Sequence, residues 1–233
     1  MTVDDFLSRL ENLKDRLVDQ GTRVGEMIED SFEALYDLDA DAAATVAARD
    51  DEVDRVDVEI ECACVALLTA ASRSGASLDE ADVRSLLTIV KVNNELERIA
   101  DAAQRIATHV EVFRRIGAPF PPTLRVMTNS VIGIVRDATA ALARDDADLA
   151  RLVLQSEDTV EQFTGALLRE ADKQIATGGF PVEFAFHLHE AAHDCEVMAD
   201  HATNIAEQVI YALTGAIVRH CEEGWKDVPV RRA

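Results

Sequence analysis

Apolar residues at helical spacing are the feature that most constrains the fold of this chain. In the first stretch they recur at steps of three, four or seven and so share one helix face: Phe6, Leu10, Leu13, Leu17, Val24, Ile28, Phe32 and Leu35. The same pattern predicts further helices over about 40–72, 79–114, 122–144, 147–176 and 182–220. Because the breaks between them are short, neighbouring helices should run antiparallel. The sequence therefore predicts an all-α fold of six long antiparallel helices.

The chain also repeats itself. Residues 27–41 align with residues 134–148 at an offset of 107, and residues 95–107 parallel residues 194–206 at an offset of 99. This duplication predicts two tandem three-helix bundles. Their expected bounds are 1–116 and 121–221, followed by a C-terminal tail over 222–233 in which we expect Trp225 to be loose.

The strongly acidic composition limits the kinds of molecule that this chain can bind. The chain carries 44 acidic and 23 basic side chains, a net charge of −21, and a duplex phosphate backbone would be repelled by such a surface. Direct nucleic-acid binding is therefore not expected.

The basic residues include only four Lys. This balance resembles proteins of salt-loving cells and favours a halophilic archaeon as the source. An ordinary acidic protein is the alternative.

The acidic start of the chain lacks the features of a secretory signal, and no apolar stretch of 18 residues occurs, so we expect a cytoplasmic protein without a membrane span. The four cysteines form neither a C-x-x-C pair nor a dense framework. We expect small buried thiols at Cys62, Cys64, Cys195 and Cys221, with metal ligation by Cys195 as an alternative.

Pairs of acidic residues four apart occur in corresponding helices of the two halves. Residues at i and i+4 share a helix face, so each pair projects two carboxylates from one patch, although such spacing is common in an acidic chain and most such pairs are solvated. The pairs are Asp50 with Asp54, Glu97 with Asp101, Glu157 with Glu161, and Glu196 with Asp200.

A distance argument indicates that these pairs meet. In an antiparallel hairpin, residues equally far from the turn lie at equal height. In the first half, the midpoint between the two acidic pairs falls inside the expected turn SRSGAS (72–77). In the second half, the midpoint falls inside the expected turn TGGF (177–180). Each half should therefore bring four carboxylates to one level. Because like charges repel, either the carboxylates point apart into water or a cation or proton lies among them. We expect a metal ion in each half, and oxygen ligands suit Mg²⁺, Mn²⁺, Ca²⁺ and iron.

Histidines distinguish the second half. His189 and His193 precede Glu196 and Asp200 at spacings that continue one helix face. Imidazole beside the second cluster would favour iron, zinc or another transition metal there. The alternative is that these histidines are exposed on a polar helix face.

Three strings carry a family resemblance: ADVR (81–84), ELERIAD (95–101) and DHATNIAE (200–207). Together they resemble the PhoU family, accessory and regulatory proteins of phosphate uptake, and the resemblance covers nearly the whole chain. It implies two three-helix bundles in line, often dimeric, with E(D)-x-x-x-D pairs that hold multinuclear iron or other metal clusters. Those pairs fall on the same eight positions. The second site departs from the family pattern at Glu161, Val197 and Met198.

By this resemblance the expected function is a negative regulator of phosphate homeostasis rather than an enzyme. The implied partners are the ATPase subunit of the phosphate ABC transporter, a sensor kinase and a second copy of the chain as a homodimer. The implied cofactors are divalent or ferric ions, namely iron, zinc, manganese or magnesium.

Two alternatives remain. A ferritin-like di-iron oxidase or storage protein would use two Glu-x-x-His motifs inside a four-helix bundle, and the sequence offers one, Glu190 to His193. A metal-free helical scaffold is the other. No G-x-S-x-G, P-loop or glycine-rich dinucleotide turn occurs, so no catalytic residues are assigned.

Overall fold

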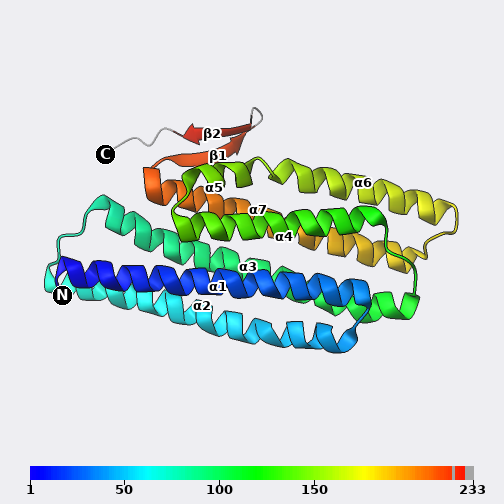
Figure 1. The fold of residues 1–233 in the computed structure, drawn as a ribbon, viewed down its shortest axis with the longest axis horizontal. Helices are drawn as coiled ribbons and strands as arrows, with labels where there is room; N and C mark the ends of the chain where they lie inside the picture. Colours follow the sequence, from blue (N-terminus) through cyan, green and yellow to red (C-terminus); the bar gives the residue numbers. More distant parts are fainter. Residues whose placement is uncertain (222–223, 229–233) are drawn as a thin grey trace.

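The computed structural model describes residues 1–221 and 224–228, and the side chains of Glu157 and of residues beyond Val218 lie outside this description. All the expected helical segments form, and a short hairpin follows them (Figure 1). The elements are α1 (Val3–Asp37), α2 (Ala40–Ser74), α3 (Glu80–Ile116), α4 (Pro122–Arg144), α5 (Ala147–Leu154), α6 (Glu157–Ala176), α7 (Val182–Thr214), β1 (Ile217–Cys221) and β2 (Gly224–Val228).

The turns α1–α2 and α4–α5 show the internal repeat in atomic detail. Leu38 and Asp145, which are 107 residues apart, both adopt left-handed backbone with φ of 54° and 52°. The next residues, Asp39 and Asp146, each accept hydrogen bonds from the backbone N–H groups two and three positions on. Each aspartate thereby caps the helix that follows. Two copies of one local sequence thus make two copies of one turn.

The fifth predicted helix is interrupted, so the structure has α5 and α6 where the periodicity predicts one helix. At the break the Ser156 N–H donates to the carbonyl of Val153, three residues back, at 3.0 Å. The Ser156 hydroxyl donates to the carbonyl of Leu152 at 3.1 Å. The backbone bond at the break spans three residues instead of four, as in a 3₁₀ turn, so the α-helical ladder is interrupted there. The apolar spacing continues across the break and therefore did not signal it.

The predicted helix over 182–220 is too long at its C-terminal end. Helix α7 ends at Thr214, and Gly215 adopts a left-handed conformation with φ of 73° while its N–H donates to the carbonyl of Tyr211. A glycine in this conformation is a common helix terminator. The following residues form an antiparallel hairpin in which the backbone of His220 is opposite that of Trp225. The expected loose tail is therefore wrong for 224–228, while 222–223 and 229–233 lie outside the described residues.

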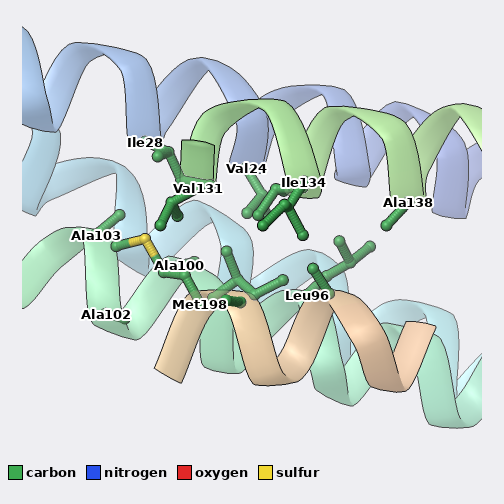
Figure 2. Packing of buried hydrophobic residues seen from close by; sticks show 14 of the residues in the cluster. Val24, Ile28, Leu96, Ala100, Ala102, Ala103, Val131, Ile134, Ala138 and Met198 are labelled. Atoms are coloured by element: carbon green, nitrogen blue, oxygen red, sulfur yellow. The ribbon is translucent and has the colours of Figure 1, made fainter. Parts of the chain in front are cut away.

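The two halves lie side by side, not in line as the family resemblance implied. In Figure 1, α1, α2 and α3 form one three-helix bundle, and α4 to α7 form a second bundle along its length. The halves meet through the pairs α3–α7 and α1–α4. Figure 2 shows this shared core, in which Val24 of α1, Leu96 of α3, Val131 of α4 and Met198 of α7 are all buried. One continuous apolar core therefore unites both bundles.

Small side chains make this side-by-side packing possible. Helices α3 and α7 contact each other along their length, and each carries fully or almost fully buried alanines, Ala100 and Ala103 in α3 and Ala199 and Ala202 in α7. Short side chains let helix backbones approach closely. Extensive apolar faces on both α3 and α7 then remain to be covered, and pairing the two halves along their length covers them.

Burial divides the cysteines. Cys64 and Cys195 are buried as expected, but Cys62 is exposed, because two residues separated by one position cannot share a helix face. Burial raises the pKa of the Cys64 thiol to about 11 and that of Cys195 further still, so both stay protonated. Cys221 lies outside the described side chains. Among the described residues, no helix carries an apolar segment long enough to span a membrane.

Candidate metal centres

The first carboxylate cluster lies between α2 and α3. Asp50 and Asp54 come from α2, and Glu97 and Asp101 come from α3. Gly75, in left-handed conformation, ends α2, and the chain turns so that α3 returns antiparallel. Residues on either side of this turn are thereby brought near one another, and burial together with the charges of Asp54 and Asp101 raises the pKa of both Asp50 and Glu97.

Crowding and burial perturb this cluster. Burial, together with the carboxylates of Asp54 and Asp101, raises the pKa of Asp50 from 3.8 to about 6. Burial and the neighbouring Asp101 also raise the pKa of Glu97, against a smaller opposing effect of Arg98. Both shifts mean that ionisation of the carboxylates in this cluster is unfavourable in the absence of a cation. A cation bound among these oxygens would remove that cost.

Two oxygens of the cluster satisfy a direct test of fit for a metal ion. Oδ2 of Asp50 accepts a hydrogen bond from Nε2 of Gln104 at 2.7 Å, but Oδ1 of Asp50 is buried without a hydrogen-bond partner among the described residues. Oε2 of Glu97 is likewise buried without one, and its nearest cation is Nε of Arg98 at 3.5 Å. Buried oxygens with free lone pairs suit a hard cation.

Asp57 belongs to this neighbourhood although the sequence analysis did not select it. Its charge contributes to the raised pKa of Glu97, and Nδ2 of Asn93 donates to Oδ1 of Asp57 at 2.6 Å. The signal was available, because Asp57 follows Asp54 by three positions and continues its helix face. The first cluster is therefore richer in carboxylates than two i,i+4 pairs alone.

The second cluster lies between α6 and α7 and is more open. Glu161 of α6 with Glu196 and Asp200 of α7 line a surface pocket of about 290 Å³. Partial burial and the charges of Glu196 and Glu161 raise the pKa of Asp200, while His201 and His193 oppose that rise. These three predicted carboxylates therefore line one pocket, but among the described residues they do not form a group of three ligand atoms within 4.8 Å of one another. The side chain of Glu157 lies outside the described residues.

The histidines of α7 divide between three environments. His193 joins the second cluster, with Nδ1 at 3.8 Å from Oε2 of Glu196 and a side chain that is 67% exposed. His189 does not line the pocket of the second cluster; it lines a neighbouring pocket, to which His193 also contributes. His201 is an inter-helix contact, since its Nδ1 lies 2.6 Å from Oε2 of Glu95 on α3.

The ferritin-like alternative finds little support in this geometry. Such a centre needs Glu-x-x-His motifs that project into a bundle core. Here Glu190 is 41% exposed and His193 is 67% exposed, so the motif lies on the outside of α7. The carboxylate clusters are also at the surface of their helix hairpins. Oxygen-only side chains of this kind are the ligands that hard cations prefer.

Comparison with known proteins connects this architecture to a family. A PhoU domain model matches residues 17–110 and 124–209. The two matched segments begin 107 residues apart and end 99 residues apart, which are the offsets of the internal repeat.

Individual relatives cover nearly the whole chain. The phosphate-specific transport system accessory protein PhoU homolog of Pseudomonas aeruginosa is 32% identical over 217 residues, covering 92% of this chain and 88% of the relative. The PhoU protein of Escherichia coli is 26% identical, with 92% and 88% covered.

Solved structures share the fold. The crystal structure of PhoU from Pseudomonas aeruginosa aligns with a TM-score of 0.83 at 30% identity, covering 90% of this chain and 99% of that chain. The phosphate transport system regulatory protein PhoU from Streptococcus pneumoniae aligns with the same TM-score at 22% identity, covering 92% of this chain and 99% of that one. With both halves matched by the domain model and the helical architecture shared, the chain belongs to the PhoU family.

Proposed function

We propose that this protein is an accessory regulator of phosphate transport, a cytoplasmic metal-binding adaptor that restrains a phosphate ABC transporter when phosphate is plentiful. The observation that carries the proposal is the match of the PhoU domain to both halves of the chain, with a carboxylate cluster on the α2–α3 hairpin and another on the α6–α7 hairpin. The relatives' printed names, which describe accessory proteins of phosphate-specific transport, supply the transport system.

The proposed mechanism follows from charge. A strongly acidic surface favours cationic partners and repels anionic ones, and a bound metal ion changes that preference locally. Asp50, Asp54, Glu97 and Asp101 would hold metal in the first half, and Glu157, Glu161, Glu196 and Asp200 in the second. The metal would supply fixed positive charge on a rigid helical face. The residues themselves orient that charge toward a docking partner, for which we propose the transporter's ATPase subunit.

A capture experiment tests the partner. Untagged wild-type protein, metal-loaded and in phosphate-rich buffer of high salt concentration, should retain the ATPase subunit of the phosphate transporter from the same organism. The variant Glu97→Gln/Asp101→Asn should retain less, because its first metal site is weakened. A matched control is Glu29→Gln/Glu33→Gln, an exposed i,i+4 pair on α1. Failure of the wild-type protein to retain the subunit would contradict the adaptor role.

Phosphate uptake tests the regulatory direction. Cells lacking this protein should take up more phosphate under replete conditions than wild-type cells, and the Glu29→Gln/Glu33→Gln control should restore restraint. Wild-type uptake in the deletion strain would contradict a negative regulator. The proposal also includes a sensor kinase as a second partner and a homodimeric state. Capture with the purified protein tests the sensor kinase, and sedimentation tests the homodimer.

A further inference from the structure

A group of metal-ligating side chains lies apart from both carboxylate clusters. His109 comes from the C-terminal part of α3, and His187 and Glu190 come from the first turns of α7. One ligand atom from each of the three side chains lies within 4.8 Å of the other two. This group is not visible as a local motif, because His109 is separated from the other two residues by most of the second half of the chain.

The distances between ligand atoms in this group are close to those of a metal site. Nδ1 of His187 lies 3.1 Å from Oε2 of Glu190, close to the separation of roughly 3.3 Å expected between two ligand atoms of a tetrahedral zinc site. That nitrogen is buried and makes no hydrogen bond with any described residue. The imidazole rings of His109 and His187 have centroids 5.3 Å apart and are tilted by 56°, so the two rings are direct neighbours.

Aromatic rings pack around the two histidines. The rings of Phe113 and Phe186 contact His187, and the ring of Phe113 also contacts His109. Asp194, whose side chain is 6% exposed, lies 3.9 Å from Nε2 of His109, and its Oδ1 accepts a hydrogen bond from Nε of Arg105 at 2.6 Å. A buried carboxylate therefore lies beside His109 at ion-pair distance.

An entry path is also present. His109 and Glu190 line a pocket of about 420 Å³ that opens to solvent beside the group. A set of two histidines and one carboxylate leaves a fourth position free for water or an exogenous ligand in zinc proteins. The pocket is the space into which that fourth position would open.

We propose that His109, His187 and Glu190 bind one transition-metal ion of the Zn²⁺ class, with its open coordination position facing this pocket. The site is chemically different from the carboxylate clusters, since imidazole ligands select zinc, cobalt or similar ions over magnesium. It does not depend on the proposed function. Because α3 belongs to the first half and α7 to the second, the ion joins the two bundles.

The test uses the full-length untagged protein with the carboxylate clusters neutralised by Glu97→Gln, Asp101→Asn, Glu196→Gln and Asp200→Asn. Co²⁺ is titrated and followed by its visible absorption, and Zn²⁺ is then added as the competitor. One Co²⁺ should bind per chain and be displaced by Zn²⁺. Each of the further changes His109→Gln, His187→Gln and Glu190→Gln should weaken binding by about 100-fold or more, since even outer-shell changes cost 10- to 100-fold.

His189→Gln is the matched control, because His189 is an exposed histidine of the same helix that lines the same pocket but is outside the three-residue group. It should retain the affinity and the absorption spectrum of the background protein. Zn²⁺ at about 100 times its dissociation constant should raise the melting temperature by about 5–10 °C in the background and the control, but not in the three ligand variants.

Metal-free melting curves identify any variant that is merely unfolded, and the half-exposed Glu190 provides a substitution that leaves the core intact. Co²⁺ binding that persists in Glu190→Gln and His187→Gln, or that is lost equally in His189→Gln, would overturn the proposal. Binding in the neutralised background also separates this site from the proposed function, because failure of transporter capture leaves the Co²⁺ result unchanged.

Discussion

At the residue scale, the carboxylate clusters combine burial with like charge. Asp50 is the clearest case, since one oxygen accepts a hydrogen bond from Gln104 and the other has no hydrogen-bond partner among the described residues. Residues with such strained electrostatics are frequent at functional sites. The metal-free cluster should therefore destabilise the fold, and a bound cation should reverse that effect.

The substitution Asp50→Asn tests whether the carboxylate cluster destabilises the metal-free protein and binds a cation. It removes one negative charge while its side-chain oxygen can still accept from Gln104. The metal-free variant should be more stable than wild type at pH 7 by about 1–2 kcal/mol, less than the shifted pKa alone would give because solvent screens the partly open cluster. Its affinity for Mn²⁺ should fall. Urea denaturation and metal titration measure the two effects, and a less stable metal-free variant would contradict the account.

The pH dependence has a defined sign. Because the pKa of Asp50 is about 6 in the folded protein against 3.8 ordinarily, the folded state binds more protons than the unfolded state between about pH 4 and 6. The contribution of Asp50 to stability is therefore present below pH 4 and is lost as the pH rises through 6. Raised pKa values at Glu97 and Asp57 act in the same direction.

A comparison of two proteins isolates this contribution. The urea midpoint of metal-free wild type, minus that of Asp50→Asn, should decrease as the pH is raised from 4 to 7. Saturating Mn²⁺ should flatten the decrease, since the cation compensates the ionised carboxylates. A difference that is independent of pH would show that Asp50 does not titrate abnormally.

Sequence reasoning reached these residues only in part. The i,i+4 spacing and the symmetry about each turn located Asp50 and Glu97, because both follow from helix geometry alone. The contact of Gln104 with Asp50 and the grouping of His109 with His187 and Glu190 were not predicted. Both depend on which face of α3 meets α2 or α7. That choice is made by packing between helices, which no local pattern encodes.

At the element scale, helix ends were predictable where capping chemistry is local. Asp39 and Asp146 set the starts of α2 and α5, and α4 has the predicted bounds Pro122–Arg144. The misses at Ser156 and Gly215 have a common cause, since apolar periodicity continues through both positions. Side chain and backbone preferences of single residues ended the helices there.

The contact between α1 and α4 gives a sharp test of helix packing. A Cβ atom added at Gly21 would lie 2.7 Å from Cγ2 of Thr139, whereas one at Gly25 would meet nothing within 4 Å. Gly21→Ala should therefore destabilise the protein by about 1–2 kcal/mol through overpacking. Gly25→Ala, the matched control on the same helix, should stabilise it by about 0.5–1 kcal/mol. Equal effects of both changes in urea denaturation would contradict the close approach.

At the scale of the whole molecule, duplication was readable from the sequence but the arrangement of the halves was not. The offsets of 107 and 99 residues reappear in the domain match. The side-by-side placement depends on the continuous apolar core shared by α1, α3, α4 and α7 (Figure 2). Aligning two copies of a bundle in sequence does not determine how they pack, because end-to-end and side-by-side arrangements have the same helical periodicity.

The net charge of −21 makes a prediction at this scale. Repulsion between like charges is screened over about 10 Å in 0.1 M salt and about 3 Å in 1 M salt. The urea midpoint should therefore rise between 0.1 and 1 M NaCl, in line with the salt adaptation that the Lys-poor composition predicts. A midpoint that stays constant or falls would contradict that interpretation.

The central claim is that carboxylates of neighbouring helices meet at one level and share a cation. The most direct measurement is the Mn²⁺ content of untagged protein after equilibrium dialysis, compared between wild type, Glu97→Gln/Asp101→Asn/Glu196→Gln/Asp200→Asn and the control Glu29→Gln/Glu33→Gln. The account predicts Mn²⁺ bound to wild type and control and lost from the four-residue variant, with helical circular dichroism unchanged in all three. Equal Mn²⁺ content in the three proteins would contradict it.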